Sequence, residues 1–325
     1  ELPAFWQGRA PPARESSIIL TLISRGDCVK MDMRASRADA GVGEIATPLS
    51  LALYMVNRLF ERKAPDPSSR VLDAGCGTGR FIEAILLWCR QRGIRPPEIV
   101  GIEINAGLAE QARRKFGGIA NVRIVHGDFL AVSEKELGGK FDYIISNPPY
   151  ISYDKIDGST RLFYKRLFRA AVGRFDIYML FFEKALDMLK PRGRMVFITP
   201  EKYLYVVSAR NLRRLLARYH VEEVELLSED AFEGVLAYPA ITVVSKSPPA
   251  KTIFRLRDDQ MVELELPADG SPWLAEALVC CQGDAYGHAS SRRRLKDIAI
   301  RISAGVATGR DNIFIIPKTA VPDSL

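Results

Sequence analysis

The chain has 325 residues, enough for one large α/β domain and a smaller second region. No apolar run reaches the ~20 residues that a membrane-spanning helix needs, which argues against a membrane protein. The formal net charge of +7 favours an acidic partner such as nucleic acid, and five cysteines without CxxC spacing argue against a zinc site or a disulfide framework.

Residues 1–43 are polar and irregular, and we expect an N-terminal arm there rather than a signal peptide. A helical pattern starts at Thr47, with Pro48 in its first turn. Strands and helices then alternate. Strands are predicted at Val71–Asp73, Ile99–Ile102, Val122–Val125, Phe141–Ile145, Met195–Ile198, Val221–Leu226 and Ile241–Val244. Helices are predicted at Phe81–Arg90, Ala106–Lys115, Ile177–Leu189 and Ala209–Arg218.

This alternation predicts an α/β fold with a Rossmann-like, mostly parallel seven-stranded sheet and helices on both faces. In such sheets the ligand lies beyond the carboxyl ends of the strands. After Val244 a linker-like stretch at 245–251 leads to two short strand-like runs and a basic cluster. We therefore predict a catalytic domain over 44–247. Over 248–325 we expect the start of an incomplete α+β or β-rich second region.

A glycine-rich turn follows the first strand of this alternation, in the run VLDAGCGTGRF. Asp73 ends the strand, and Gly75, Gly77 and Gly79 allow a tight turn into a helix and a close approach of backbone to ligand. The GxGxG spacing after an aspartate fits a nicotinamide or flavin fingerprint poorly.

Two further acids end the next two strands. Glu103 can accept hydrogen bonds from both hydroxyls of a ribose. Asp128 can accept one from an adenine amino group, while Phe129 or Ile104 packs on the adenine ring. Each acid alone is as easily an ordinary surface residue. Three acids at three successive strand ends are harder to explain by chance.

The segment SNPPY, residues 146–150, carries the most specific signal. Consecutive prolines have no backbone N–H to donate, so they form a stiff segment whose carbonyls can accept. The Asn147 side-chain oxygen and the Pro148 carbonyl can accept both protons of a planar NH2 group, and Tyr150 can stack on the substrate ring. The loop leaves adenine in DNA, guanine in ribosomal RNA and glutamine in release factors open. Methylation of a cytosine ring carbon would need a cysteine nucleophile, and no cysteine here follows a proline.

The order of these motifs resembles the class I S-adenosylmethionine methyltransferases. Over about 44–317 the chain further resembles the gamma group of N6-adenine DNA methyltransferases, in its Eco57I and TaqI branch. The segments that carry this second resemblance are EIATPLSLALYMV (44–56), NPPYISYDKI, the run from FYKRLF to EKYL (163–204), FEGVLAYPAITVV (232–244) and AIRISAGVATGRDNIFIIP (299–317).

The resemblance implies S-adenosylmethionine as the cofactor and no metal. The implied cofactor-binding residues are Thr47, Pro48, Asp73, Ala74, Gly75, Gly77, Glu103, Ile104, Asp128, Phe129 and Asn147. The implied catalytic loop is Asn147, Pro148, Pro149 and Tyr150. Asp176 matches an acidic position near the cofactor, and Phe232, with Tyr238 as runner-up, supplies a second aromatic face for the base.

The implied function is site-specific adenine-N6 methylation of double-stranded DNA in a bacterial or archaeal cytoplasm, at the nucleoid, as the modification enzyme of a restriction-modification system. A cognate restriction endonuclease or specificity subunit is the further partner expected. The target base must be extruded from the duplex. Phosphate contacts are expected from Lys165, Arg166 and Arg169, which are interleaved with Tyr164 and Phe168, and from the run Arg292, Arg293 and Arg294.

Two other functions stay open. A protein-glutamine or ribosomal-RNA amino methyltransferase uses the same loop, but such proteins usually place their extra mass before the sheet, whereas here it follows. A non-catalytic DNA-binding subunit with a relic cofactor fold would predict erosion of the glycine turn or of the loop, and neither is eroded.

Overall fold

All seven predicted strands are present in the computed structural model, which describes residues 47–228 and 238–281. They are β1 (Arg70–Ala74), β2 (Glu98–Glu103), β3 (Val122–His126), β4 (Phe141–Ser146), β5 (Leu189–Pro200), β6 (His220–Leu226) and β7 (Pro239–Ser245). Two more strands, β8 (Thr252–Arg255) and β9 (Met261–Leu264), extend the same sheet. The order is β3-β2-β1-β4-β5-β7-β6-β8-β9, and β7 runs antiparallel to both of its neighbours.

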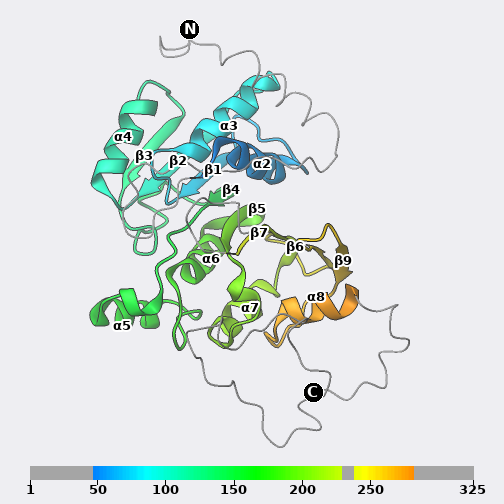
Figure 1. Cartoon of the computed structure of the whole chain (residues 1–325). Helices are drawn as coiled ribbons and strands as arrows, with labels where there is room; N and C mark the ends of the chain where they lie inside the picture. Colours follow the sequence, from blue (N-terminus) through cyan, green and yellow to red (C-terminus); the bar gives the residue numbers. More distant parts are fainter. Residues whose placement is uncertain (1–46, 229–237, 282–325) are drawn as a thin grey trace, which may run out of the picture. The chain divides into compact units, whose positions relative to one another are not determined.

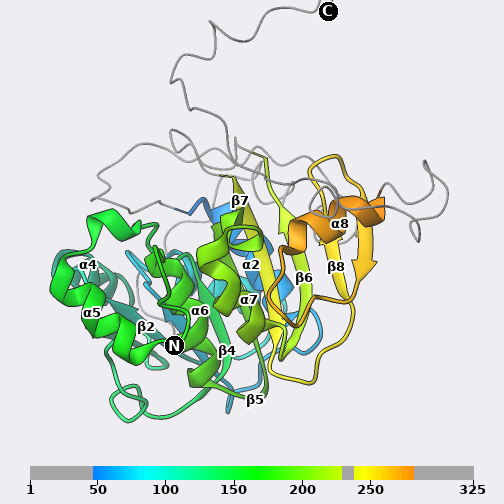
Figure 2. The same cartoon turned by 90° about the horizontal axis from the view of Figure 1, so that it is seen from below.

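Helices cover both faces of this sheet (Figures 1 and 2). The helices are α2 (Leu49–Phe60), α3 (Arg80–Gln91), α4 (Ala106–Phe116), α5 (Gly158–Leu167), α6 (Ile177–Met188), α7 (Arg210–Leu216) and α8 (Trp273–Cys281). The 3-10 turns are η2 (Tyr153–Lys155), η3 (Glu201–Leu204) and η4 (Val207–Ala209). Within the described part of the chain, no helix combines the length and the apolar character that crossing a bilayer requires.

Alternating side chains of the strands divide the core in two. In β1, Val71 joins a core with α2, α3 and α4, while the next residue, Leu72, joins the core with α6, α7 and α8. Both residues are fully buried. A strand buried on both faces reads as a continuous apolar run, which is why the sequence pattern located these strands.

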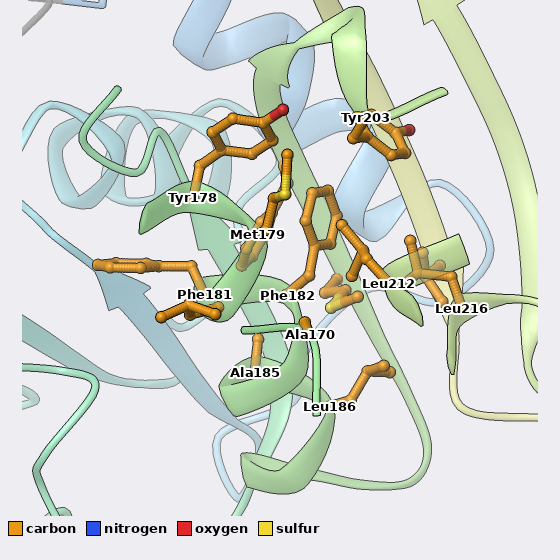
Figure 3. Packing of buried hydrophobic residues seen from close by; sticks show 14 of the residues in the cluster. Ala170, Tyr178, Met179, Phe181, Phe182, Ala185, Leu186, Tyr203, Leu212 and Leu216 are labelled. Atoms are coloured by element: carbon orange, nitrogen blue, oxygen red, sulfur yellow. The ribbon is translucent and has the colours of Figure 1, made fainter. Parts of the chain in front are cut away.

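Helix α6 is apolar on nearly all sides because it is enclosed by the sheet and by other helices. The Phe182 ring lies 4.8 Å from the ring of Phe197 on β5 and 5.5 Å from that of Tyr203 in η3. Leu212 of α7 packs in the same cluster (Figure 3). The start of α6 is also fixed, since the backbone N–H of Ile177 donates to the carbonyl of Ile151 just after the diproline loop.

The sheet continues past residue 248, where we expected the catalytic domain to end. Strand β8 pairs with β6, and Phe254 is fully buried. The buried guanidinium of Arg213 on α7 donates to the carbonyls of Gly270 and Ser271, which holds the segment before α8 against the core. The sheet extends beyond residue 248 because β6 would otherwise have a free edge, and pairing with β8 satisfies the hydrogen-bonding groups of its backbone. The arm over 1–43, residues 229–237 and residues 282–325 lie outside the described residues, so the recognition region stays a prediction.

Candidate cofactor and substrate site

The glycine turn between β1 and α3 requires glycine at three positions. Gly75, Gly77 and Gly79 have φ values of 79°, 52° and 85°, in the left-handed region that other residues rarely adopt. The N–H groups of Gly75 and Cys76 both donate to the carbonyl of Ile102 on β2, at 2.9 Å. A Cβ built on Gly77 would meet no atom within 4 Å, so the backbone there borders open space that a ligand can approach closely.

Glu103 at the end of β2 is tied to this turn. One carboxylate oxygen accepts the Gly77 N–H at 2.9 Å and the other accepts the Asn105 N–H at 2.8 Å. The side chain is buried, so these two backbone donors fix its orientation. Each carboxylate oxygen has a second lone pair. The predicted role as acceptor for a ribose is therefore compatible with this geometry.

Asp73 occupies the most demanding position in the site. Its carboxyl group is fully buried at the end of β1, and among the described residues neither oxygen has a hydrogen-bond partner. Burial, and then the negative charge of Glu103, raise the pKa of Asp73 well above its ordinary value of 3.8. A buried acceptor without a donor costs roughly 1–3 kcal/mol. A ligand that brings hydrogen-bond donors or a positive charge would remove that cost.

Asp128, after β3, is half-buried and has two partners. It accepts the Leu130 N–H at 2.9 Å and the Tyr164 hydroxyl at 3.3 Å. The two residues that were predicted to pack on an adenine differ in their exposure to solvent. Phe129 is buried with its ring 5.0 Å from that of Phe181, whereas Ile104 is 64% exposed next to Glu103.

The diproline loop begins where β4 ends, one strand over from the glycine turn. The Ser146 hydroxyl donates to the Ala74 carbonyl, which joins the loop to the end of β1. The Asn147 amide nitrogen donates to the Thr47 hydroxyl at 3.1 Å, so the segment before α2 sets the orientation of this amide. The chain leaves β1 toward β2 on one side and returns to β4 on the other, and ligands bind at such a switch point.

Tyr150 is held on the other side of the loop. Its hydroxyl donates to the Ile198 carbonyl on β5 at 3.3 Å, and its ring lies edge-on to Tyr178 with centroids 6.4 Å apart. Burial raises the pKa of the Tyr150 hydroxyl, so this group is a neutral donor at physiological pH. Both ends of the loop are therefore fixed, one to β1 and Thr47 and the other to β5.

Comparison with known proteins finds sequences and folds that are similar to this chain. Residues 98–232 match the family model described as Eco57I restriction-modification methylase. Type II methyltransferase M.XhoI of Xanthomonas vasicola is 27% identical over 234 residues, covering 61% of this chain and 41% of that protein. Type II methyltransferase M.PaeR7I of Pseudomonas aeruginosa is 29% identical over 241 residues, covering 66% and 40%. The chain is therefore similar to Eco57I-like methyltransferases over these residues.

The fold is similar to that of a class I methyltransferase. A Listeria monocytogenes protein assigned to the class I S-adenosylmethionine-dependent methyltransferases superposes with a TM-score of 0.53 at 20% identity, over 63% of this chain and 62% of that one. The chain spans about two fifths of the length of the two type II methyltransferases.

The residues of the methyltransferase domain fit S-adenosylmethionine, the cofactor of class I methyltransferases. The Asp73 carboxyl, which has no hydrogen-bond partner among the described residues, suits a positively charged group, and the open space at Gly77 admits a ligand against the backbone. Glu103 and Asp128 present carboxylate oxygens at the next two strand ends. These acids lie on three adjacent strands of the methyltransferase sheet, as the sequence predicted.

Two other predicted site residues, Asp176 and Tyr238, have their described contacts with cationic side chains and not with the glycine turn or the diproline loop. Asp176 is buried before α6 and forms an ion pair with Lys202 at 2.5 Å. The Tyr238 ring lies 4.8 Å from the Arg257 guanidinium. Phe232 and the run 292–294 lie outside the described residues.

The cationic segment 165–169 differs from the sequence interpretation. Lys165, Arg166 and Arg169 are exposed, but the aromatic residues between them are not on the same surface. Tyr164 and Phe168 are both buried in the core. The sequence analysis also missed Tyr178 and Lys202, which contact Tyr150 and Asp176 more than 20 residues away in the chain. It missed the ring of Tyr153, because the helix that brings Arg161 and Lys165 to this ring was not predicted.

Proposed function

We propose that this methyltransferase domain transfers a methyl group from S-adenosylmethionine to the N6 amino group of adenine in double-stranded DNA, as a gamma-group modification enzyme of a restriction-modification system. The observation that carries the proposal is the loop Asn147–Tyr150, held beside the glycine turn by Thr47 and by β5. An exocyclic amine is the group that two neighbouring fixed acceptors can orient.

The chemistry needs two acceptors and no covalent catalysis. The side-chain oxygen of Asn147 accepts a hydrogen bond from one N–H of the target amine, and the Pro148 carbonyl accepts a hydrogen bond from the other N–H. The bond from the Asn147 amide nitrogen to Thr47 keeps the amide from rotating. Two such hydrogen bonds turn the nitrogen lone pair out of the ring system. When bound, S-adenosylmethionine would supply an electrophilic methyl group. The bond from that methyl to the sulfonium sulfur would break as the amine nitrogen takes it, a neutral thioether would leave, and the methylated nitrogen would then release one proton.

The substrate base must leave the duplex before its amine can reach the loop, which costs a few kcal/mol. Tyr150 supplies an aromatic face already fixed by its bond to Ile198. Stacking on an aromatic side chain contributes about 1–3 kcal/mol for each base. Phe232 would supply the opposite face, with Tyr238 as the alternative. The balance of extrusion and stacking thus depends on a second aromatic face or on contacts to the DNA backbone.

DNA as the partner is supported by charge and by the relatives. The net charge is +7, and the exposed Lys165, Arg166 and Arg169 follow the loop closely. The matched proteins are named type II methyltransferases and a restriction-modification methylase. We propose that residues 248–325 lead into a target-recognition region. We further propose a restriction endonuclease or a specificity subunit as partner.

A methyl-transfer assay with three substrates tests the proposal. The protein is incubated with methyl-labelled S-adenosylmethionine and, separately, unmethylated mixed-sequence DNA, ribosomal RNA and release factor. We expect label only in DNA, recovered as N6-methyladenine after digestion to nucleosides. Label in RNA guanine or in protein glutamine would show that RNA or protein, and not DNA, is the substrate. Cofactor binding without transfer to any of the three would instead indicate a non-catalytic subunit.

A further inference from the structure

Positive charge is concentrated in the segment that directly follows the diproline loop. Residues 153–174 contain six cationic and two acidic side chains, a net charge of +4 within a chain of net charge +7. The cations are Lys155, Arg161, Lys165, Arg166, Arg169 and Arg174, and the acids are Asp154 and Asp157. More than half of the net charge therefore belongs to 22 residues that begin three positions after Tyr150.

Three of these cations converge on the ring of Tyr153. The Arg161 guanidinium lies 4.3 Å from the ring centroid, the Lys165 ammonium 5.4 Å and the Arg174 guanidinium 5.9 Å. The ring also packs edge-on against the buried Phe175, with centroids 5.5 Å apart. An aromatic face attracts cations, so a fixed ring can hold side chains that would otherwise separate.

The cations at this ring are only partly neutralised. Arg174 forms an ion pair with Asp154, and Arg161 donates to the backbone carbonyl of Asp154 at 3.2 Å. Among the described residues neither Arg161 nor Lys165 has a carboxylate partner. Like charges held this close repel one another, and a bound anion would relieve that repulsion.

The location relates these cations to the substrate. Tyr153 and Tyr150 belong to one short segment, whose position is fixed where Ile177 donates to the Ile151 carbonyl at 3.0 Å. A nucleotide whose base reaches Tyr150 carries its own phosphates nearby. We infer that Tyr153, Arg161, Lys165 and Arg174 form a phosphate-binding site that holds the DNA backbone beside the extruded nucleotide. This inference rests on the proposed function.

The site differs from the one expected from sequence, where Tyr164 and Phe168 were the aromatic residues among the cations. Both are buried, and Tyr164 is the buried residue that anchors α5 to the core. The exposed side of α5 then turns Arg161 and Lys165 toward Tyr153. Of the cations that sequence alone had indicated, the inferred site keeps Lys165, and it adds Arg161, Arg174 and the ring of Tyr153.

The test compares two double variants of equal charge change. Arg161→Gln with Lys165→Gln removes two cations from the site. Arg114→Gln with Lys135→Gln removes one arginine and one lysine that are exposed and have no carboxylate partner among the described residues. Binding of a fluorescein-labelled mixed-sequence duplex is measured by anisotropy across a series of salt concentrations.

We expect the slope of log affinity against log salt to fall by about 1.8 in magnitude for the site variant, since each phosphate contact contributes about 0.9. The KM for DNA should rise, while kcat at saturating DNA and cofactor affinity stay unchanged. The control variant should keep the wild-type slope. Exchanging the two types of cation, Arg161→Lys with Lys165→Arg, should also keep it because the charge is retained.

An unchanged slope in the site variant, or an equal fall in the control, would overturn the inference. A loss of kcat without a change in slope would also overturn it, because that would place the two residues in the chemical step. The proposed function is judged separately on the wild-type protein. If the wild type methylates RNA and not DNA, the proposed function fails, and the same variants are then measured with that RNA.

Discussion

Replacing Asp73 with asparagine should stabilise the protein without cofactor and weaken its binding of cofactor. The carboxyl group is fully buried beside Glu103, and no donor among the described residues reaches either oxygen. Replacing the ionisable group removes the penalty that burial and Glu103 place on its charged form, about 1.4 kcal/mol for each pH unit by which the pKa is raised. For a chain of this size that is about 2–4 °C in Tm for each kcal/mol.

The effect depends on pH in a defined direction. Burial and Glu103 raise the pKa of Asp73 in the folded protein. A raised folded-state pKa means that stability is fully present below the ordinary value and is lost as pH rises through the raised one. The wild-type protein should therefore lose stability relative to Asp73→Asn from about pH 4 upward. Near that pH or below it, the two proteins should differ least.

Thermal unfolding with and without S-adenosylmethionine measures both effects. Cofactor should raise the Tm of the wild type more than that of Asp73→Asn, because a ligand at free concentration L stabilises the folded state by RT ln(1 + L/Kd), which falls as binding weakens. Asp142→Asn is the matched control. That carboxylate accepts the Arg70 N–H and the Lys190 ammonium, both at 2.8 Å, so its replacement should destabilise the protein and leave cofactor binding unchanged. Undiminished cofactor binding by Asp73→Asn would refute the reasoning.

Three other predictions concern the loop and its support. Asn147→Ala should lower kcat by about 100- to 1000-fold, the usual effect of deleting one group that positions developing charge. Isothermal titration should show near-normal cofactor affinity for this variant. Loss of kcat and cofactor affinity together would contradict the role of Asn147 as an acceptor for the amine. Tyr150→Ala should weaken capture of the extruded base by about 1–3 kcal/mol, measured by 2-aminopurine fluorescence. Tyr150→Phe keeps the ring and should lose only the hydrogen bond to Ile198. Equal effects of the two variants would mean that the hydroxyl, and not the ring, captures the base. Arg194→Met should lower the free energy of unfolding by about 3 kcal/mol, because the buried Arg194 pairs with Glu222 at 2.8 Å and caps the end of α2. Calorimetry should show a Tm lower by roughly 6–12 °C. An unchanged Tm would show that the ion pair does not stabilise the protein.

The central strands were predictable because they are buried on both faces of the sheet. Runs such as Val71–Asp73 and Ile241–Val244 have no polar alternation to confuse with a surface strand, and their positions are confirmed. Helix α5 was not predicted. Tyr164 is its buried residue, while Leu162 and Leu167 are exposed, so its apolar residues do not follow the helical period.

The site was predictable as a set of positions but not as a set of contacts. Parallel strands place their carboxyl ends at one edge, so motifs that end successive strands must meet there. Which groups are satisfied depends on packing across many residues. Glu103 accepts from the glycine turn, whereas Asp73 has no partner among the described residues. No spacing in the sequence distinguishes these two acids.

The cofactor site and the DNA-facing helix are connected through Tyr164. This residue anchors α5 in the core, and its hydroxyl donates to Asp128, the carboxylate proposed to hold the cofactor's adenine. The same helix carries Arg161 and Lys165 to the ring of Tyr153. A cofactor that contacts Asp128 would share this carboxylate with Tyr164. We therefore expect occupancy of the cofactor site to influence the position of α5 and of the phosphate-binding site that it carries. Measurements of DNA affinity therefore need a fixed, saturating concentration of cofactor.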